Sequence, residues 1–181
     1  TFEPPYGMEG TRLWLKSVAG LFKREAAAEK AFAAEFAPWS RHWDALRRRA
    51  LELKFAFVVD RAQLPRLKDA SLMWGVPILA LLREMGVRAE VLLFNGKDSG
   101  PMKGFKDQPE LERRLREGAY DAVYSEFFFD ERLVRAGTVP FSLAPFEPGV
   151  RGAAATLERL LALGRWGFYR RYAPYLQGAR P

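Results

Sequence analysis

Short apolar runs that alternate with helix-forming stretches are the feature that most constrains how this chain folds. The clearest run is residues 54–60, Lys-Phe-Ala-Phe-Val-Val-Asp, where consecutive apolar residues end at an aspartate. Such a run is typical of a strand buried on both faces of a parallel sheet. We expect further strands at residues 89–94, 120–125 and 139–143.

The stretches between these runs have the composition and spacing of helices, at residues 76–85, 109–116, 130–136 and 152–163. Gly86, Gly118 and Gly137 follow the first three stretches, where a C-cap glycine is expected. Strands and helices that alternate over short connections favour right-handed crossovers. The sequence therefore predicts an α/β fold, a Rossmann-like domain with a four-stranded parallel sheet flanked by helices.

The chain before Lys54 is different, because its apolar residues recur at helical spacing over residues 11–23 and 26–53. Pro38 is expected to kink or split the second helix. We therefore divide the chain into a helical segment, a Rossmann-like domain and an aromatic, basic tail, at residues 1–53, 54–164 and 165–181. The tail is expected either to stack on a flat ligand or to pack against protein.

Composition excludes several kinds of site. The chain has no cysteine and one histidine, so a four-cysteine iron–sulfur site cannot be internal to it. His42 has no second ligand near it, and we interpret it as structural. No apolar run reaches the roughly 18 residues of a membrane span. The formal charge is +7, but the basic residues are interleaved with glutamates, which argues against nucleic acid as a partner.

Common enzyme motifs are absent, including the dinucleotide and P-loop patterns. Residues 95–100, Asn-Gly-Lys-Asp-Ser-Gly, look like a phosphate loop, but Pro101 follows where a helix would start. We interpret this segment as a mobile basic loop.

An ordered set of segments resembles the C-terminal part of the nitrogenase component 1 type oxidoreductase superfamily, and is closest to the N subunit of dark-operative protochlorophyllide reductase. The segments are Pro-Tyr-Gly-Met-Glu-Gly-Thr-Arg-Leu-Trp-Leu-Lys at 5–16, the strand 55–60, Leu-Leu-Arg-Glu-Met-Gly-Val at 81–87, Tyr-Asp-Ala-Val at 120–123, Ala-Gly-Thr-Val-Pro at 136–140 and Pro-Phe-Glu-Pro-Gly-Val-Arg-Gly-Ala at 145–153. Their order and spacing match over most of the chain.

The resemblance implies a parent protein that takes electrons from an iron–sulfur reductase and passes them through a cluster to a substrate between its domains. The family's cluster cysteines lie in its N-terminal half. We therefore expect this chain to be a cytoplasmic fragment that is inactive alone and holds no cofactor of its own. The iron–sulfur cluster is expected in the parent complex. Its expected partners are the rest of the subunit, a paired component 1 subunit and the reductase. Residues 1–53 are expected to pack beside the α/β domain.

Candidate site residues follow from the loops at the carboxyl ends of strands, where such folds bind ligands. The substrate-binding candidates are Asp60, Arg61, Asn95, Lys97, Ser125, Phe127, Phe128, Phe146 and Gly149. Asp60 is expected either to accept a ligand hydrogen bond or to cap the next turn. Residues 127–129 are expected to form either an apolar wall for a flat macrocycle or part of a core or interface. We expect no catalytic residue, with Glu126 the best acid candidate. The alternative function is a non-catalytic Rossmann-like binding or interaction module.

Overall fold

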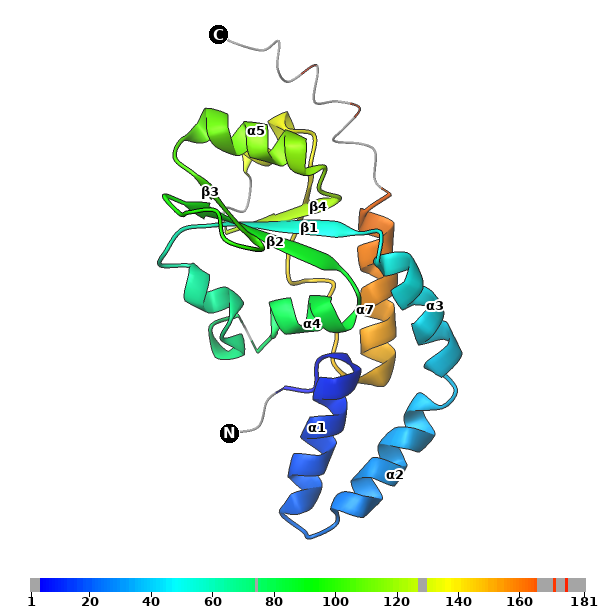
Figure 1. Ribbon diagram of the computed structural model, residues 1–181. Coiled ribbons are helices and arrows are strands. Elements are labelled where there is room, and N and C mark those ends of the chain that lie inside the picture. The colour runs from blue at the N-terminus through cyan, green and yellow to red at the C-terminus, as the bar shows by residue number, and fades with distance from the viewer. Residues whose placement is uncertain (1–3, 74, 127–129, 166–170, 172–174, 176–181) are drawn as a thin grey trace. The chain divides into compact units, whose positions relative to one another are not determined.

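The computed structural model describes residues 4–73, 75–126 and 130–165, together with Arg171 and Tyr175. It has an α/β fold with a five-stranded parallel sheet flanked by helices and a helical N-terminal segment (Figure 1). The elements are α1 (Gly7–Gly20), α2 (Glu25–Phe36), α3 (Ser40–Ala50), β1 (Lys54–Val59), two short 3-10 helices η1 (Leu64–Leu67) and η2 (Ala70–Leu72), α4 (Ile78–Glu84), β2 (Arg88–Phe94), β3 (Met102–Phe105), α5 (Gln108–Gly118), β4 (Ala122–Ser125), α6 (Glu131–Arg135), β5 (Val139–Phe141) and α7 (Gly149–Leu163).

The strands lie in the order β3-β2-β1-β4-β5, and every neighbouring pair is parallel. Figure 1 shows β1 between β2 and β4, and Phe57 of β1 is in register with Val91 on one side and Tyr124 on the other. A central strand has side chains buried on both faces, which explains the continuous apolar run in β1. The predicted Rossmann-like sheet is confirmed.

The sheet has five strands where the sequence predicted four. The additional strand is β3, in residues expected to form a loop, and it occupies an edge of the sheet. An edge strand has one neighbour, and in β3 only Gly104 and Phe105 are buried, so its sequence carries little apolar signal. The connection before it is held by Asp98, whose Oδ1 accepts a 2.8 Å hydrogen bond from the Gly104 amide.

The chain forms two compact units. The one that we call unit 2 comprises Glu52–Pro65, Val87–Ser142 and Leu161–Pro181, and it contains all five strands with α5 and α6. One face of its sheet packs against those helices through a core of Ala56, Val58, Leu92, Phe105, Leu111, Leu115, Tyr120, Val123 and Leu133. The opposite face carries an aromatic cluster in which the rings of Phe57, Tyr124 and Phe141 lie within 5.9 Å of one another.

Unit 1 comprises Thr1–Leu51, Arg66–Gly86 and Leu143–Leu160. Its helices α1 and α2 lie side by side (Figure 1). The chain between α2 and α3 contains Pro38, so the predicted split of the long helix is confirmed. The predicted domain limits at residues 53 and 164 stay a prediction.

Hydrogen bonds within unit 1 hold the start of α1 and the segment before it. A carboxylate oxygen of Glu84 in α4 accepts bonds from the amides of Met8, at 2.7 Å, and Glu9, at 3.1 Å, and so caps α1. The Gly149 amide donates a 2.8 Å bond to the Pro5 carbonyl. Two segments far away in the sequence therefore fix residues 5–9.

The glycines at the helix ends have two different roles. Gly86 and Gly137 have φ of 85° and 73°, as expected for residues that terminate helices in the left-handed region. After α5, however, Ala119 adopts that conformation with φ 47°. Gly118 is required for space instead, because a Cβ there would lie 2.1 Å from Cε2 of Tyr120.

Candidate functional site

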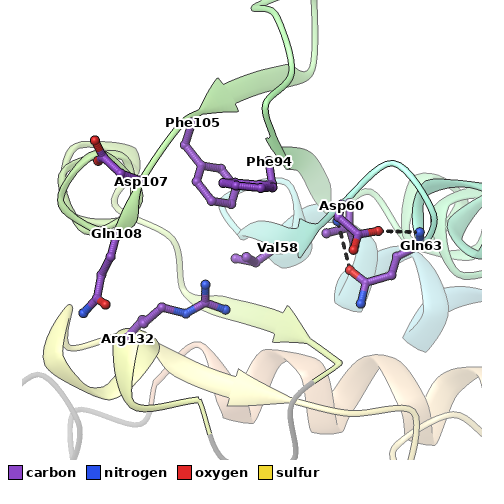
Figure 2. A pocket seen from close by; sticks show the side chains of 9 residues that line it. Val58, Asp60, Gln63, Phe94, Phe105, Asp107, Gln108 and Arg132 are labelled. Atoms are coloured by element: carbon purple, nitrogen blue, oxygen red, sulfur yellow. Dashed lines mark hydrogen bonds between the residues drawn. The ribbon is translucent and has the colours of Figure 1, made fainter.

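A cavity of about 250 Å³ opens at the carboxyl edge of the sheet in unit 2 (Figure 2). Strands β1, β2 and β3 end here, and the starts of α5 and α6 complete the wall. The lining residues are Val58, Val59, Asp60, Gln63, Phe94, Phe105, Asp107, Gln108 and Arg132. The cavity thus occupies the edge at which parallel α/β sheets bind their ligands.

Asp60 and Gln63 hold the turn that follows β1. The Gln63 amide donates to Oδ1 of Asp60 at 2.8 Å, and the Asp60 amide donates to Oε1 of Gln63 at 2.9 Å. Asp60 therefore caps the following turn, which is one of its two predicted roles. Nε2 of Gln63 also donates to Oε2 of Glu126 at 3.0 Å, which links the chain after β1 to the chain after β4.

Asp130 organises the start of α6. It is 8% exposed, and its oxygens accept bonds from Nε of Arg132 at 2.8 Å, Nη2 of Arg132 at 2.7 Å and Oγ of Ser125 at 2.7 Å. Burial alone would raise the pKa of Asp130, but the bonds from Arg132 and Ser125 outweigh it and lower that pKa. Asp130 in turn raises the pKa of Arg132. The pair is ionised, and the guanidinium is held in one plane.

The remaining walls are aromatic and polar. The rings of Phe94 and Phe105 lie with centroids 5.6 Å apart at 50°. Asp107 caps α5 by accepting a 2.9 Å bond from the Glu110 amide, and Gln108 is the first residue of that helix. The cavity therefore combines an apolar surface with polar groups fixed by hydrogen bonds, as ligand sites commonly do.

Several predicted site residues meet at this edge. Asp60 lines the cavity, Glu126 bonds to the lining residue Gln63, and Ser125 supports the Asp130–Arg132 pair. Nη2 of Arg61 donates to the carbonyl of Asn95 at 3.5 Å, so these exposed residues join the ends of β1 and β2.

The other candidates lie elsewhere. Lys97 is exposed in the connection between β2 and β3. Phe127 and Phe128 lie outside the described residues, as does most of the tail. Phe146 and Gly149 belong to unit 1, where Phe146 is 7% exposed and Gly149 begins α7 with φ 83°.

The structure adds eight lining residues that the sequence did not single out as site residues: Val58, Val59, Gln63, Phe94, Phe105, Asp107, Gln108 and Arg132. For Asp107 a signal existed, because an aspartate three residues before a glutamate marks a helix start. Gln63 and Arg132 line the cavity because a turn and a helix cap hold their side chains there. The sequence holds no comparable signal for this.

Within the described part of the chain, no group of three or more histidine, cysteine, aspartate or glutamate side chains is arranged to hold a metal ion. Over the same residues, no helix is long and apolar enough to cross a membrane.

No family model matches the sequence, and no curated protein matches it. Among solved structures, nitrogenase Cp1 at pH 5 aligns with 99% of this chain at a TM-score of 0.60 and 12% identity. Nitrogenase Cp1 at pH 6.5 aligns with 98% of it at 0.57 and 11%. The chain spans 43% and 45% of those proteins' chains. The fold is thus that of part of a nitrogenase component 1 chain, which confirms the sequence resemblance at the level of fold.

Proposed function

We propose that this chain is the C-terminal domain of a nitrogenase-like oxidoreductase subunit, similar to the N subunit of protochlorophyllide reductase. It contributes walls of a substrate pocket and part of a subunit interface, and it holds no redox centre. The observation that carries this proposal is the alignment of nearly the whole chain with less than half of nitrogenase Cp1. A likeness of that extent is expected for one domain of a longer subunit.

The redox centre is assigned to the rest of the complex because this chain lacks the ligands. It has no cysteine, and iron–sulfur clusters are held mainly by thiolates. An iron–sulfur cluster would therefore be bound by the remainder of the parent subunit or a paired component 1 subunit. An iron–sulfur reductase would supply the electrons.

The proposed substrate walls are the carboxyl edge of the sheet and the segment before α7. At the sheet edge in unit 2 the candidates are Asp60, Arg61, Asn95, Lys97, Ser125 and Glu126. Phe146 and Gly149 are separate candidates in unit 1. Glu126 is the acid candidate, since its carboxylate bonds to Gln63 beside the cavity. A carboxylic acid at the edge of a pocket is suited to proton transfer.

The proposed interface is the hairpin of α1 and α2. Leu21 and Phe22 at its tip are 68% and 70% exposed, and Leu13 is 41% exposed. A groove of about 680 Å³ between the helices is lined mainly by apolar side chains, including Val18 and Phe22. Contiguous exposed apolar surface of this kind marks interaction sites. Trp43 in α3 is not part of this exposed surface, because it is 4% exposed and belongs to the core.

The redox assignment is tested by anaerobic reconstitution of the purified chain with iron and sulfide. We expect a colourless protein without stoichiometric iron, because thiolate ligands are absent. Stoichiometric iron with iron–sulfur absorption would overturn the assignment.

The interface is tested by sedimentation of the chain and of Phe22→Asp. We expect association that increases with concentration in the unmodified chain and is lost in the variant, because a charge would be buried at the contact. Leu72→Asp is the matched control, since Leu72 is 52% exposed and does not line the groove. Equal association of all three proteins would place the interface elsewhere.

The second candidate, a non-catalytic binding module, is favoured by the cavity, whose walls are fixed by bonds within this chain. The two candidates differ in what the complete gene encodes. Cluster-ligating cysteines upstream of Thr1 support the oxidoreductase subunit, whereas a start codon at that point supports the module.

A further inference from the structure

One cation faces an aromatic wall across the strand-edge cavity. Arg132 reaches in from the start of α6, and the rings of Phe94 and Phe105 lie opposite it (Figure 2). The side chain of Val58 forms the surface between them. Guanidinium groups and aromatic rings both stack on flat π systems, so the two walls suit the same kind of ligand.

The guanidinium is held in place before any ligand arrives. Two of its nitrogens bond to the two carboxylate oxygens of Asp130, at 2.8 and 2.7 Å, and Ser125 holds Asp130 in turn. A side chain fixed by a bidentate bond loses little conformational entropy on binding. The guanidinium plane is therefore fixed in orientation at the wall of the cavity.

The charge and size of the cavity restrict the ligand further. Asp130 balances the charge of Arg132, so the other charged groups among the lining residues are the carboxylates of Asp60 and Asp107. An anionic ligand is disfavoured by that charge. A volume of about 250 Å³ lies below the range of sites for drug-sized ligands and holds one ring system, not a macrocycle.

We propose that this cavity binds a single uncharged planar heteroaromatic ring of the nucleobase class, stacked between Arg132 and the rings of Phe94 and Phe105. Gln108 supplies an edge contact. Nε2 of Gln108 donates to Oε1 of Glu112 at 3.1 Å. The side-chain carbonyl oxygen of Gln108 is then the acceptor for an exocyclic amine of the ligand. The binding requires no electron transfer, so it stands or falls separately from the proposed oxidoreductase role.

The direct test is a titration of the 181-residue chain, followed by NMR of the ligand's aromatic protons and by calorimetry. Adenosine is the probe, ribose the control without a ring system, and adenosine monophosphate the anionic control. We expect saturable binding of adenosine, weaker binding of the monophosphate and none of ribose. Absent adenosine binding, equal binding of ribose, or tighter binding of the monophosphate would each overturn the proposal.

Two variants locate the bound ring. Arg132→Lys keeps the charge but removes the planar surface, and we expect about tenfold weaker adenosine binding. Phe94→Leu removes one ring and should weaken it about fivefold; because Phe94 is 41% exposed, this variant remains folded and informative if Arg132→Lys does not. Arg135→Lys, on the exposed side of the same helix, is the matched control and should bind like the original chain. Unchanged affinity in Phe94→Leu would overturn the assignment of the ring to this cavity.

Discussion

At the amino edge of the sheet, polar side chains bond from strand to strand, whereas at the carboxyl edge most of them bond within one loop. Glu90 in β2 accepts a 2.6 Å bond from the hydroxyl of Tyr120, just before β4, and pairs at 3.0 Å with Nζ of Lys54 in β1. The Lys54 ammonium also lies 4.8 Å from the Tyr120 ring centroid. Three neighbouring strands are thereby tied together.

The bonds at the carboxyl edge shape the connections instead. Asp60 bonds to Gln63, and Asp130 bonds to Arg132, each within a few residues along the chain. Apart from the links from Gln63 to Glu126 and from Arg61 to Asn95, these bonds fix each loop to itself, and a cavity is left between the loops. The same kinds of side chain therefore tie strands together at one edge and line a cavity at the other, so changes at the two edges should have different consequences.

Gly118→Ala should have the largest effect, because the new Cβ would lie 2.1 Å from Cε2 of Tyr120 and displace that ring from Glu90. We expect the free energy of unfolding, measured in urea, to fall by about 2–3 kcal/mol. Adenosine affinity should not change. In Gly10→Ala, the matched control within α1, the nearest atom to the new Cβ is 3.6 Å away, and stability should rise by up to about 1 kcal/mol. Similar losses in both variants would show that the contact with Tyr120 is not the cause.

Tyr120→Phe should have an intermediate effect, since it removes the hydroxyl that donates to Glu90. We expect a loss of about 1.5 kcal/mol at pH 7, as for a hydrogen bond to a charged group. Burial alone would raise the pKa of Glu90, but the bonds from Tyr120 and Lys54 outweigh it and lower that pKa. Stability from a lowered carboxyl pKa is present above the ordinary value of about 4.3 and is lost as the pH falls through the folded pKa.

The difference between Tyr120→Phe and the original chain should therefore shrink in urea unfolding at acidic pH. The control makes Tyr120→Phe in a Glu90→Gln background, where the side chain at position 90 carries no charge to titrate. There the effect of removing the hydroxyl should be nearly the same at pH 7 and at acidic pH. A difference that grows on acidification would contradict the role given to the Glu90 carboxylate.

Gln63→Ala should have the smallest effect on global stability, below about 1 kcal/mol, because Gln63 is only partly buried and its bonds serve the turn after β1. The effect should be local. Hydrogen exchange is expected to accelerate at the amides of Asp60 and Gln63 and to stay unchanged at Val58. Faster exchange throughout β1 would show that the carboxyl edge also holds the strands together.

The fold was largely predictable because its central strands are buried on both faces and therefore consist of unbroken apolar runs. Strand β3 was missed because Met102 and Lys103 at the sheet edge need not be apolar. Pro38 identified the break between α2 and α3 through covalent geometry alone. These are local constraints, which a single sequence records directly.

The site was predictable only in part. The position of Asp60 and Ser125 at the carboxyl edge was predictable because parallel strands bring their carboxyl ends to one edge. Arg132 was missed because its direction depends on the bond to Asp130 at the start of α6. The spacing of residues along the chain does not specify which way such a side chain points.

The bond between the Gly149 amide and the Pro5 carbonyl also bears on how the chain folds during synthesis. Unit 1 is assembled from three stretches of sequence, the last of which begins at Leu143. Helices α1–α3 leave the ribosome long before that stretch does, and contacts between distant residues form only after both partners have been made. The segment that leads into α1 must therefore remain without this bond until the start of α7 emerges.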